Sequence, residues 1–391
     1  MAEARLYQVA LPMRYGFDHP AARRSRSDSL LLRLTVDGVS GLGECAPRAY
    51  VTGETTASVR AELQRVAMRV LLERLRTEDP AELAAQLRQD GFARTFQVRG
   101  GNNLLCLLET AVLDLLGRRL ELSAGALVCP EANGGGTLPI SQVLDLGITV
   151  EEFLATRGPF HFVKVKASND LDRDVRTVRA LRAELGPDVP ISMDANMSWT
   201  PEQALTALRR LSACGLSLVE EPLPKGSWAE LAELRCQVGV PVMLDESVCT
   251  LADAQAAVRA GACDAVNVRV AKCGGLLNSV RLVDFAHQHG LDFQVGVQVA
   301  ETGPLIAAGR HLAFGRPGAL TVESGQSDRY FPEPVAAPLP PVDRRANTIS
   351  PPGGTGFAMT LQDSAEPWAV LRLQAGTDTW LPAAAAPKAE I

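Results

Sequence analysis

The sequence predicts an α/β barrel with a smaller α+β domain beside it, and two patterns carry this prediction. From about residue 138 onward, short apolar segments alternate with helical segments, as βα units do. The apolar segments lie near 138–143, 161–166, 190–194, 216–220, 241–245, 265–269, 292–297 and 319–323. Eight such units close a modified TIM barrel of parallel strands. Before this region, strand-like segments precede helical ones, which is typical of an α+β domain.

The α+β domain is expected over residues 1–132. Residues 5–11, 29–36 and 41–45 are rich in strand-forming side chains, and the intervening Asp37-Gly38 pair favours a hairpin turn. Residues 56–120 follow a helical period, most clearly over 103–116. We therefore expect an antiparallel sheet followed by helices.

The barrel is expected over residues 133–330. Thr200 caps a helix predicted over 201–214, and a second helix is predicted over 276–288. The following proline-rich segment, residues 331–380, ends in two short strand-like runs. It is expected to return to the first domain, so that both ends of the chain form one capping domain. Residues 381–391 are rich in alanine and proline and are expected to be disordered.

Composition favours a small-molecule partner. The net charge of -6 and the absence of a basic run argue against a nucleic-acid surface. The sequence has neither a signal-peptide pattern nor an apolar run of membrane-spanning length, so a cytoplasmic location without membrane contact is expected. None of the eight cysteines has the two-residue spacing of zinc or redox motifs, which fits reduced thiols in a cytoplasm.

Three acidic residues, Asp194, Glu220 and Asp245, each end an apolar segment at nearly one βα-unit spacing. The carboxyl ends of barrel strands meet at one mouth, so we expect these side chains to lie together. Carboxylates without a nearby histidine or thiolate favour Mg²⁺, with Mn²⁺ as a substitute, over zinc. A single acid at such a position often caps the next helix, so the prediction rests on the three together. Asn196 shares the face of Asp194 and is expected either to bind substrate or to shape the helix entry.

Lys164 and Lys166 alternate with valines in the segment 163–166, so both amines point to one face of the strand. A divalent ion that holds a substrate carboxylate eases removal of the proton from the neighbouring carbon. A lysine beside that ion has its ammonium form disfavoured by the ion's charge and by burial, so it can act as a neutral base. Lys166, nearer the strand end, is the candidate base, and Lys164 is expected to assist electrostatically. The alternative of two surface lysines fits poorly with the valines and with Phe162.

These residues match a known pattern: the chain resembles the enolase superfamily, in its muconate-lactonizing and mandelate-racemase-like branch, over about residues 4–375. The resemblance is carried by Lys164-Val-Lys166, Asp194-Ala-Asn196, Glu220-Glu-Pro222, Asp245-Glu-Ser247 and Lys272-Cys-Gly-Gly275. It implies that Asp194, Glu220 and Asp245 bind magnesium, with Glu246 and Lys272 behind them. It also implies that Lys166 abstracts the α-proton of a carboxylate to give an enediolate intermediate.

The resemblance further implies that the capping domain closes over the barrel mouth. Residues 50–55 are similar to the mobile capping loop of the family, so Tyr50 and Thr52 are expected to touch substrate. Glu301, after the seventh strand, resembles a family position near the substrate, although a structural hydrogen bond is an equal alternative. Glu323 on the eighth strand is a weaker candidate, because the family often has an acidic pair there. The family often forms oligomers, so a homo-oligomer is expected.

One position departs from the family pattern. The lysine-using branch carries a second catalytic lysine at the end of the sixth strand, where this chain has Arg269. Strands two and six are opposite in an eight-membered barrel, and racemisation needs a base on each face of the substrate. Arginine stays protonated in proteins, so Arg269 is a poor proton shuttle and a good fixed cation.

Three functions remain open from the sequence. The first is a magnesium-dependent, one-base isomerase or lyase acting on a small carboxylate, of the muconate cycloisomerase or succinylbenzoate-synthase type. Arg269 would then hold a substrate anion or stabilise the enediolate. The second is a racemase or epimerase of N-acylamino acids or dipeptides. The third is a binding homologue that has lost turnover.

Overall fold

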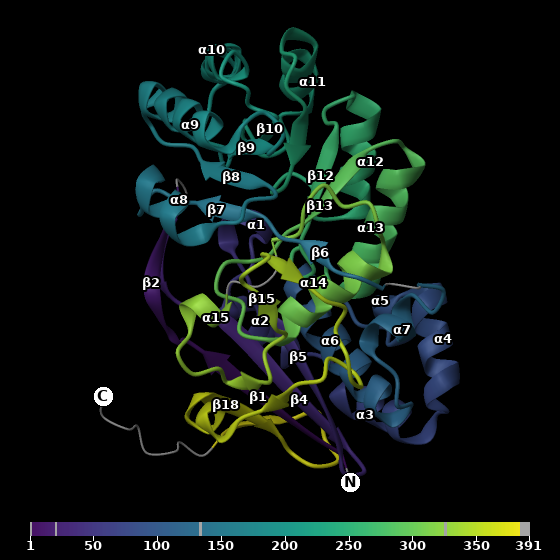
Figure 1. Cartoon of the computed structure of the whole chain (residues 1–391). Coiled ribbons are helices and arrows are strands. Elements are labelled where there is room, and N and C mark those ends of the chain that lie inside the picture. The colour runs from purple at the N-terminus through teal and green to yellow at the C-terminus, as the bar shows by residue number, and fades with distance from the viewer. Residues whose placement is uncertain (1, 20–21, 133–134, 324–326, 384–391) are drawn as a thin grey trace.

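The computed structural model describes residues 2–19, 22–132, 135–323 and 327–383, and the remaining residues lie outside this description. A curled parallel sheet surrounded by helices occupies one half of the molecule, and a domain built from both ends of the chain occupies the other (Figure 1). The predicted combination of an α/β barrel with an α+β capping domain is confirmed.

The capping domain contains a five-stranded antiparallel sheet in the order β19-β18-β1-β4-β5. Its strands are β1 (Ala2–Val9), β4 (Ser29–Val36), β5 (Val39–Cys45), β18 (Ala369–Leu373) and β19 (Trp380–Pro382). The C-terminal segment therefore returns to the N-terminal sheet as expected. Asp37 and Gly38, with φ angles of 48° and 85°, form the predicted two-residue turn between β4 and β5.

Helix α6 (Asn102–Arg119) packs directly on β5. A Cβ atom at Gly41 or Gly43 would lie 2.2 Å from a carbonyl oxygen of α6, so only glycine permits this approach. The other helices of this domain are α1 (Ala49–Thr52), α2 (Thr56–Leu63), α3 (Met68–Thr77), α4 (Pro80–Asp90), α5 (Phe92–Thr95) and α7 (Ala124–Val128). The helical region predicted over 56–120 is thus confirmed.

A separate hairpin, β2 (Pro12–His19) and β3 (Ala22–Arg26), extends from the capping domain along the side of the molecule toward the barrel (Figure 1). The sequence did not indicate it, because Arg14, Gly16 and the arginines near residue 24 interrupt any apolar alternation. The hairpin carries Phe17, whose side chain is buried.

Seven parallel strands form the barrel sheet, and each pairs with its neighbours in sequence order. They are β7 (Gln142–Leu144), β8 (Val163–Lys166), β9 (Ile191–Asp194), β10 (Leu218–Glu220), β11 (Val242–Leu244), β12 (Ala265–Val268) and β13 (Asp292–Val295). The eighth expected strand, 319–323, is a bridge instead: Val322 pairs once with Val295 and once with Ile140. One paired residue on each side is too short a ladder to form a strand, yet it joins the two edges of the sheet.

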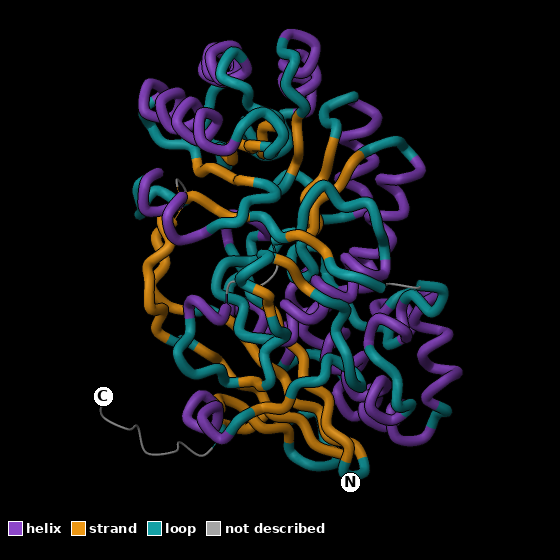
Figure 2. Tube along the Cα trace, viewed as in Figure 1, coloured by secondary structure: helices purple, strands orange, loops and turns teal. Residues whose placement is uncertain are grey.

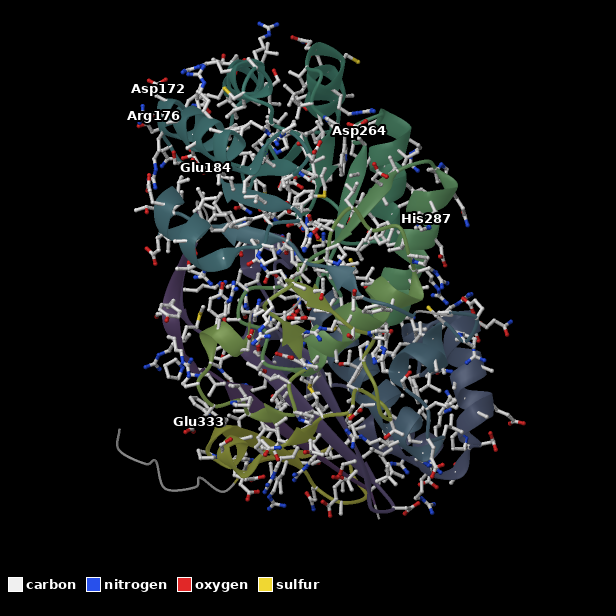
Figure 3. The ribbon with its side chains drawn as sticks, in the orientation of Figure 1. Asp172, Arg176, Glu184, Asp264, His287 and Glu333 are labelled. Atoms are coloured by element: carbon white, nitrogen blue, oxygen red, sulfur yellow. The ribbon has the colours of Figure 1, made fainter. Side chains whose placement is uncertain are left out.

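Helices cover the outside of the strands, as the tube view shows (Figure 2). They are α8 (Val150–Arg157), α9 (Leu171–Leu185), α10 (Pro201–Ser212), α11 (Trp228–Gln237), α12 (Leu251–Ala260), α13 (Leu276–Gln288) and α14 (Pro304–Gly315). The predicted Thr200 cap is present, because its hydroxyl accepts from the Gln203 amide. Helix α9 is amphipathic: Val178 and Leu181 are buried, whereas the charged Asp172, Arg176 and Glu184 lie on its outer side (Figure 3).

After the barrel, the chain forms short elements before it rejoins the capping domain. These are α15 (Ser327–Tyr330), β14 (Ala336–Ala337), β15 (Val342–Asp343), β16 (Thr348–Ile349), β17 (Thr360–Leu361) and a 3₁₀ helix at Asp363–Trp368. Strand β16 pairs with β6 (Leu138–Pro139). Leu381 and Pro382 belong to β19, so the expected disorder does not begin at 381, and residues 384–391 lie outside the described residues.

Two further findings concern the whole chain. All eight cysteines are free thiols, and Cys236 alone among them is exposed. Among the described residues, no helix is both long and apolar enough to cross a membrane.

Candidate active site

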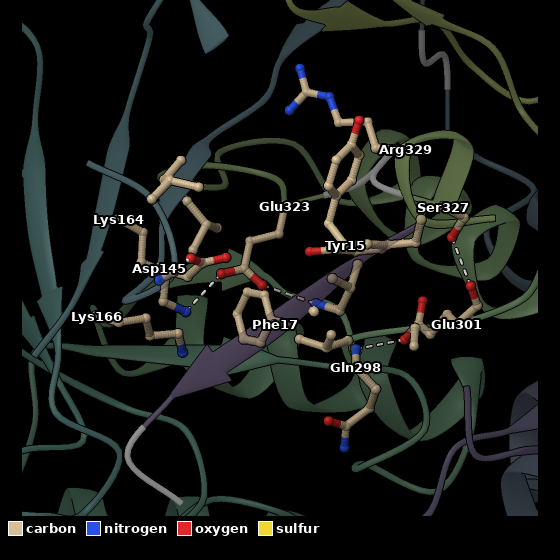
Figure 4. A pocket seen from close by; sticks show the side chains of 18 of the residues that line it. Tyr15, Phe17, Asp145, Lys164, Lys166, Gln298, Glu301, Glu323, Ser327 and Arg329 are labelled. Atoms are coloured by element: carbon tan, nitrogen blue, oxygen red, sulfur yellow. Dashed lines mark hydrogen bonds and ion pairs between the residues drawn. The ribbon is translucent and has the colours of Figure 1, made fainter. Parts of the chain in front are cut away.

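A cavity of about 790 Å³ opens at the carboxyl ends of the barrel strands. Lys164, Lys166 and Arg269 line it from the barrel, and Phe17 and Tyr50 line it from the capping domain. In the close-up, the two lysines lie on one side, Gln298 and Glu301 lie on the other, and Phe17 stands between them (Figure 4).

Strand register brings the predicted residues to one level of the barrel. Lys166 pairs with Asp194, and Asp194 pairs with Glu220, across β8, β9 and β10. Asp245 and Arg269 directly follow β11 and β12. Because side chains alternate along a strand, the residues below them on the same face also point inward. These lower residues, Phe162, Leu218, Met243 and Ala265, form a separate buried apolar cluster.

Lys166 is held at the base of the cavity. Its Nζ donates to Asp194 Oδ2 at 2.6 Å and to Asn196 Oδ1 at 3.1 Å. The Phe17 ring centroid lies 5.8 Å from the same nitrogen, which adds a cation–π contact from the capping domain. The amine thus faces the cavity between one carboxylate, one amide and one aromatic ring.

Lys164 lies among three carboxylates. Its Nζ is 2.7 Å from Glu220 Oε2, 2.7 Å from Glu323 Oε1 and 3.2 Å from Asp194 Oδ2. Burial alone lowers the pKa of this lysine, but the three carboxylates outweigh burial and raise the pKa well above its usual value. Lys164 is therefore a fixed cation, and its electrostatic role in catalysis stays a prediction.

Asp245 is held by residues that do not line the cavity. Lys272 Nζ donates to the Asp245 carboxylate at 2.9 Å and to its carbonyl oxygen at 2.7 Å. Glu221 accepts the Asp245 backbone N–H at 2.6 Å and also bonds to the Ser247 hydroxyl and amide. Burial raises the pKa of Glu221 to about 7. Lys272 thus contacts Asp245 directly, and its role behind a metal ligand stays a prediction.

Arg269 is fixed on the opposite side of the barrel from Lys166. Its guanidinium contacts Asp245, lies 3.7 Å from Glu246 Oε1 and donates to Gln298 Oε1 at 2.8 Å. The side chain is buried and lines the cavity. It offers a fixed positive charge there.

The remaining predicted residues divide into two groups. Tyr50, Asn196, Glu246 and Glu301 line the cavity. Asn196 also donates to Glu246 Oε1 at 3.2 Å, and burial together with the nearby Asp194 raises the pKa of Glu246 to about 8. Thr52 does not belong to the cavity lining, because its hydroxyl accepts from the Asn103 amide at 3.1 Å instead.

Several lining residues were not predicted from the sequence. They are Arg14, Tyr15 and Phe17 from β2, Asp145 after β7, Arg157 from α8, Gln298, and Ser327 to Tyr330 around α15. Asp145 is an acidic residue at the end of an apolar segment, Val143-Leu-Asp145, as are Asp194 and Asp245. The sequence therefore contained the signal that would predict it. The residues of β2 and α15 follow no such pattern.

The donor set suits a divalent cation. Seven buried carboxylates surround four buried cations: Asp194, Glu220, Glu221, Asp245, Glu246, Glu301 and Glu323 against Lys164, Lys166, Arg269 and Lys272. Among the described residues, Glu220 Oε2 and Asp245 Oδ2 accept no hydrogen bond, and they contact the cationic groups of Lys164 and Arg269 respectively. In the described part of the chain, no three acidic, histidine or cysteine side chains are already arranged as ligands around one ion. In chemistry and charge, the three predicted carboxylates nevertheless fit Mg²⁺.

A parallel barrel with carboxylates and a buried lysine at its mouth defines an acid–base enzyme of the isomerase or lyase type. The chain belongs to the family described as enolase C-terminal domain-like, whose model matches residues 145–365. The resemblance inferred from the sequence is thus confirmed. Members of this superfamily abstract the proton next to a carboxylate with the help of a magnesium ion, which is the chemistry that the sequence indicated.

Relatives add detail. A hydrophobic dipeptide epimerase from Citrifermentans bemidjiense is 32% identical over 321 residues, which cover 78% of this chain and 83% of the relative. The crystal structure of N-succinyl Arg/Lys racemase from Bacillus cereus superposes with a TM-score of 0.81 at 24% identity, covering 95% of this chain and 98% of the other. A dipeptide epimerase from Cytophaga hutchinsonii, complexed with Mg and the dipeptide D-Ala-L-Val, gives a TM-score of 0.79 at 20% identity, covering 92% and 96%.

Proposed function

We propose that this chain removes the α-proton of a small N-acylamino acid or dipeptide carboxylate, with Lys166 as the base and Mg²⁺ as the cofactor. The observation that carries the proposal is the Lys166 amine, which faces the cavity at the level of Asp194 and Glu220. The racemase and epimerase names of the relatives support this substrate class over muconates.

Asp194, Glu220 and Asp245 would hold the magnesium ion. The bound ion supplies Lewis-acid stabilisation of negative charge on the substrate carboxylate. The Asn267 amide donates to Glu220 Oε1 at 2.8 Å, so Oε2, which lies 2.7 Å from Lys164 Nζ, would be the oxygen offered to an ion. Lys272 and Glu221 similarly hold the third ligand, Asp245, in place. Such supporting contacts typically decide metal affinity.

The neutral amine of Lys166 would take the proton from the α-carbon, and the electrons of the broken C–H bond would move into the carboxylate to form an enediolate. Asp194 and Asn196 orient the amine. The fixed positive charges of Lys164 and Arg269 lie on the cavity wall and oppose the growth of negative charge on the substrate. Because arginine is a poor base, Arg269 itself is not the second base that inversion of the α-carbon would need.

A second candidate is racemisation or epimerisation, which the activities named for the relatives favour. This reaction needs a second proton donor on the Arg269 side of the substrate. The two candidates share the Lys166 step and differ only in how the proton returns.

The test is α-proton exchange in deuterated water, followed by proton NMR with Mg²⁺ on a panel of N-succinylamino acids and dipeptides. Lys166→Arg places at this position a guanidinium group that cannot act as a base, so we expect the exchange rate to fall by about 10²- to 10⁴-fold. Lys225→Arg is the control, since Lys225 bonds to the Val51 carbonyl and does not line the cavity. Unchanged exchange in Lys166→Arg would reject Lys166 as the base.

Four further expectations stay predictions. They are Mn²⁺ as a substitute for Mg²⁺, assembly into a homo-oligomer, a cytoplasmic location, and the division of the chain at residues 132, 330 and 380.

A further inference from the structure

The face of the cavity opposite Lys166 carries a second titratable group, Glu301. Strand β12 lies four positions from β8 around the ring in either direction, once Val322 joins its edges. Glu301 follows β13, the neighbour of β12, and lines the cavity. The close-up shows it across the cavity from Lys166 (Figure 4).

The Glu301 side chain is only 4% exposed and is incompletely bonded. Oε1 accepts the Gln298 backbone N–H at 2.7 Å, whereas Oε2 has no hydrogen-bond partner among the described residues. The Glu301 carbonyl oxygen accepts the Ser327 hydroxyl at 2.7 Å, which fixes the backbone. A buried polar atom on a cavity wall that lacks a hydrogen-bond partner can interact directly with a bound substrate.

The charged groups around Glu301 are Glu44, Arg48 and Arg269. Both arginines are engaged elsewhere: Arg48 donates to backbone carbonyls, including Val299 at 2.7 Å, and Arg269 bonds to Gln298 and Asp245. Burial, and after it the charge of Glu44, raises the pKa of Glu301 well above its usual value. Both effects favour the protonated form of the carboxyl group.

We propose that Glu301 is the catalytic acid–base residue of the second face and delivers a proton to the α-carbon from the side opposite Lys166. This inference rests on the proposed function and extends it to inversion of configuration. Arg269 is then a positioning residue, because it holds the Gln298 side chain, and the Gln298 backbone holds Glu301.

The protons balance over one turnover. Lys166 takes the α-proton and becomes an ammonium, the enediolate forms, and the Glu301 carboxyl gives its proton to the other face of the α-carbon and becomes a carboxylate. Exchange with water then removes the proton from Lys166 and restores one to Glu301. The opposite enantiomer reacts by the reverse sequence, with Glu301 as the base and Lys166 as the acid.

Glu301→Gln tests the proposal on the same deuterium-exchange panel. The wild-type protein should invert both enantiomers. Glu301→Gln should still exchange the enantiomer whose α-proton faces Lys166, while inversion falls by about 10²- to 10⁴-fold. Glu301→Asp, which keeps the acid, should recover part of the inversion. Inversion at the wild-type rate in Glu301→Gln would overturn the proposal.

The remaining outcomes separate this proposal from the proposed function. Exchange without inversion in the wild-type protein would overturn the role of Glu301 and leave Lys166 as the base, whereas a silent panel would reject both. Glu109→Gln, the same change at a buried glutamate that does not line the cavity, is the control and should invert at the wild-type rate. The infrared carbonyl band of a protonated carboxyl gives a readout independent of substrate: a wild-type-minus-Glu301→Gln spectrum at pH 7 without this band would overturn the proposal.

Discussion

Lys272 shows how a side chain outside the cavity can govern the metal site. Its ammonium group is fully buried and bonds to the Asp245 carboxylate and to two carbonyl oxygens, those of Asp245 and Asn267. Burial lowers the pKa of this lysine, so its charge depends on these partners. Removing the ammonium group takes one donor away from each of these three buried oxygens.

We therefore expect Lys272→Met to weaken Mg²⁺ binding by about 10- to 100-fold. It should also lower the free energy of unfolding by about 3 kcal/mol, since one partner of a buried ion pair is removed. Calorimetric titration with MgCl₂ and urea denaturation measure the two effects. Lys225→Met, at an exposed lysine whose amine bonds to the Val51 carbonyl, should leave Mg²⁺ affinity unchanged. Wild-type affinity in Lys272→Met would show that Asp245 is not a ligand, or that it needs no support.

Strand parity explains which site residues the sequence could predict. Lys164, Lys166, Asp194 and Glu220 lie on short strands whose alternation fixes the direction of each side chain. Phe17 had no such signal, because its neighbours break the strand pattern. Glu44 and Glu109 are also buried acids with structural contacts across the two domains, but in the sequence they resemble ordinary polar residues of a strand and a helix. Long-range contacts alone reveal their roles.

At the N-termini of two barrel helices, backbone amides donate hydrogen bonds to carboxylates of the capping domain. Glu109 on α6 accepts the Leu277 amide at 3.0 Å at the start of α13. Glu44 on β5 accepts the amides of Thr302 at 2.6 Å and Leu305 at 3.1 Å at the start of α14. A carboxylate satisfies the free N–H groups at a helix N-terminus and interacts favourably with its dipole. These contacts attach the capping domain to the barrel at two helix ends.

Glu109 gives a pH prediction. Burial raises its pKa to about 8, against the lowering effect of the Leu277 and Leu276 amides, whereas a glutamate in an unfolded chain has a pKa of about 4.3. Between these values the folded chain keeps a proton that the unfolded chain releases. The contribution of Glu109 to stability is therefore complete below about pH 4.3 and is lost as the pH rises toward 8.

The side chain in Glu109→Gln stays neutral at every pH. The variant should therefore not show this loss of folding stability as the pH rises. Relative to wild type, the free energy of unfolding of the variant should rise by a few kcal/mol between about pH 5 and about pH 8, as measured by urea denaturation. Parallel pH profiles for the two proteins would mean that Glu109 has an ordinary pKa in the folded state.

The β2–β3 hairpin places the aromatic ring of Phe17 beside the amine of Lys166, the proposed base. Phe17 is buried against Lys166, and its neighbours Arg14 and Tyr15 also line the cavity. Phe17→Ala should admit water around the amine, so we expect a higher KM and a lower kcat, each by roughly 10-fold. Phe17→Leu keeps most of the apolar volume and serves as the control. If the kcat and KM of Phe17→Ala match those of wild type, the hairpin has no part in the active site.

Over the whole molecule, repetition made the barrel predictable. The βα units repeat the same signals of apolar strand, polar end and capped helix, and helix α13 has the bounds that the sequence predicted. The bridge at Val322 and the pairing of β16 with β6 depend on contacts between distant segments. Local sequence does not encode the length of such ladders, so the extent of the eighth strand was overestimated.

The two domains meet at one cavity, with the acid–base residues on the barrel and their cover on the capping domain. Substrate should therefore be enclosed by residues from both, while the barrel alone supplies the chemistry. In the proposed function, Lys166 removes the α-proton of the substrate whose carboxylate the metal ion stabilises.

The most direct measurement is α-proton exchange by the wild-type protein in deuterated water, with N-succinylamino acids and dipeptides, before and after removal of metal with EDTA. Exchange should occur with Mg²⁺, stop after EDTA treatment and return when MgCl₂ is added in excess. Asp245→Asn should need a higher Mg²⁺ concentration for the same rate. Exchange that continues at full rate in EDTA would contradict metal-assisted proton abstraction at this site.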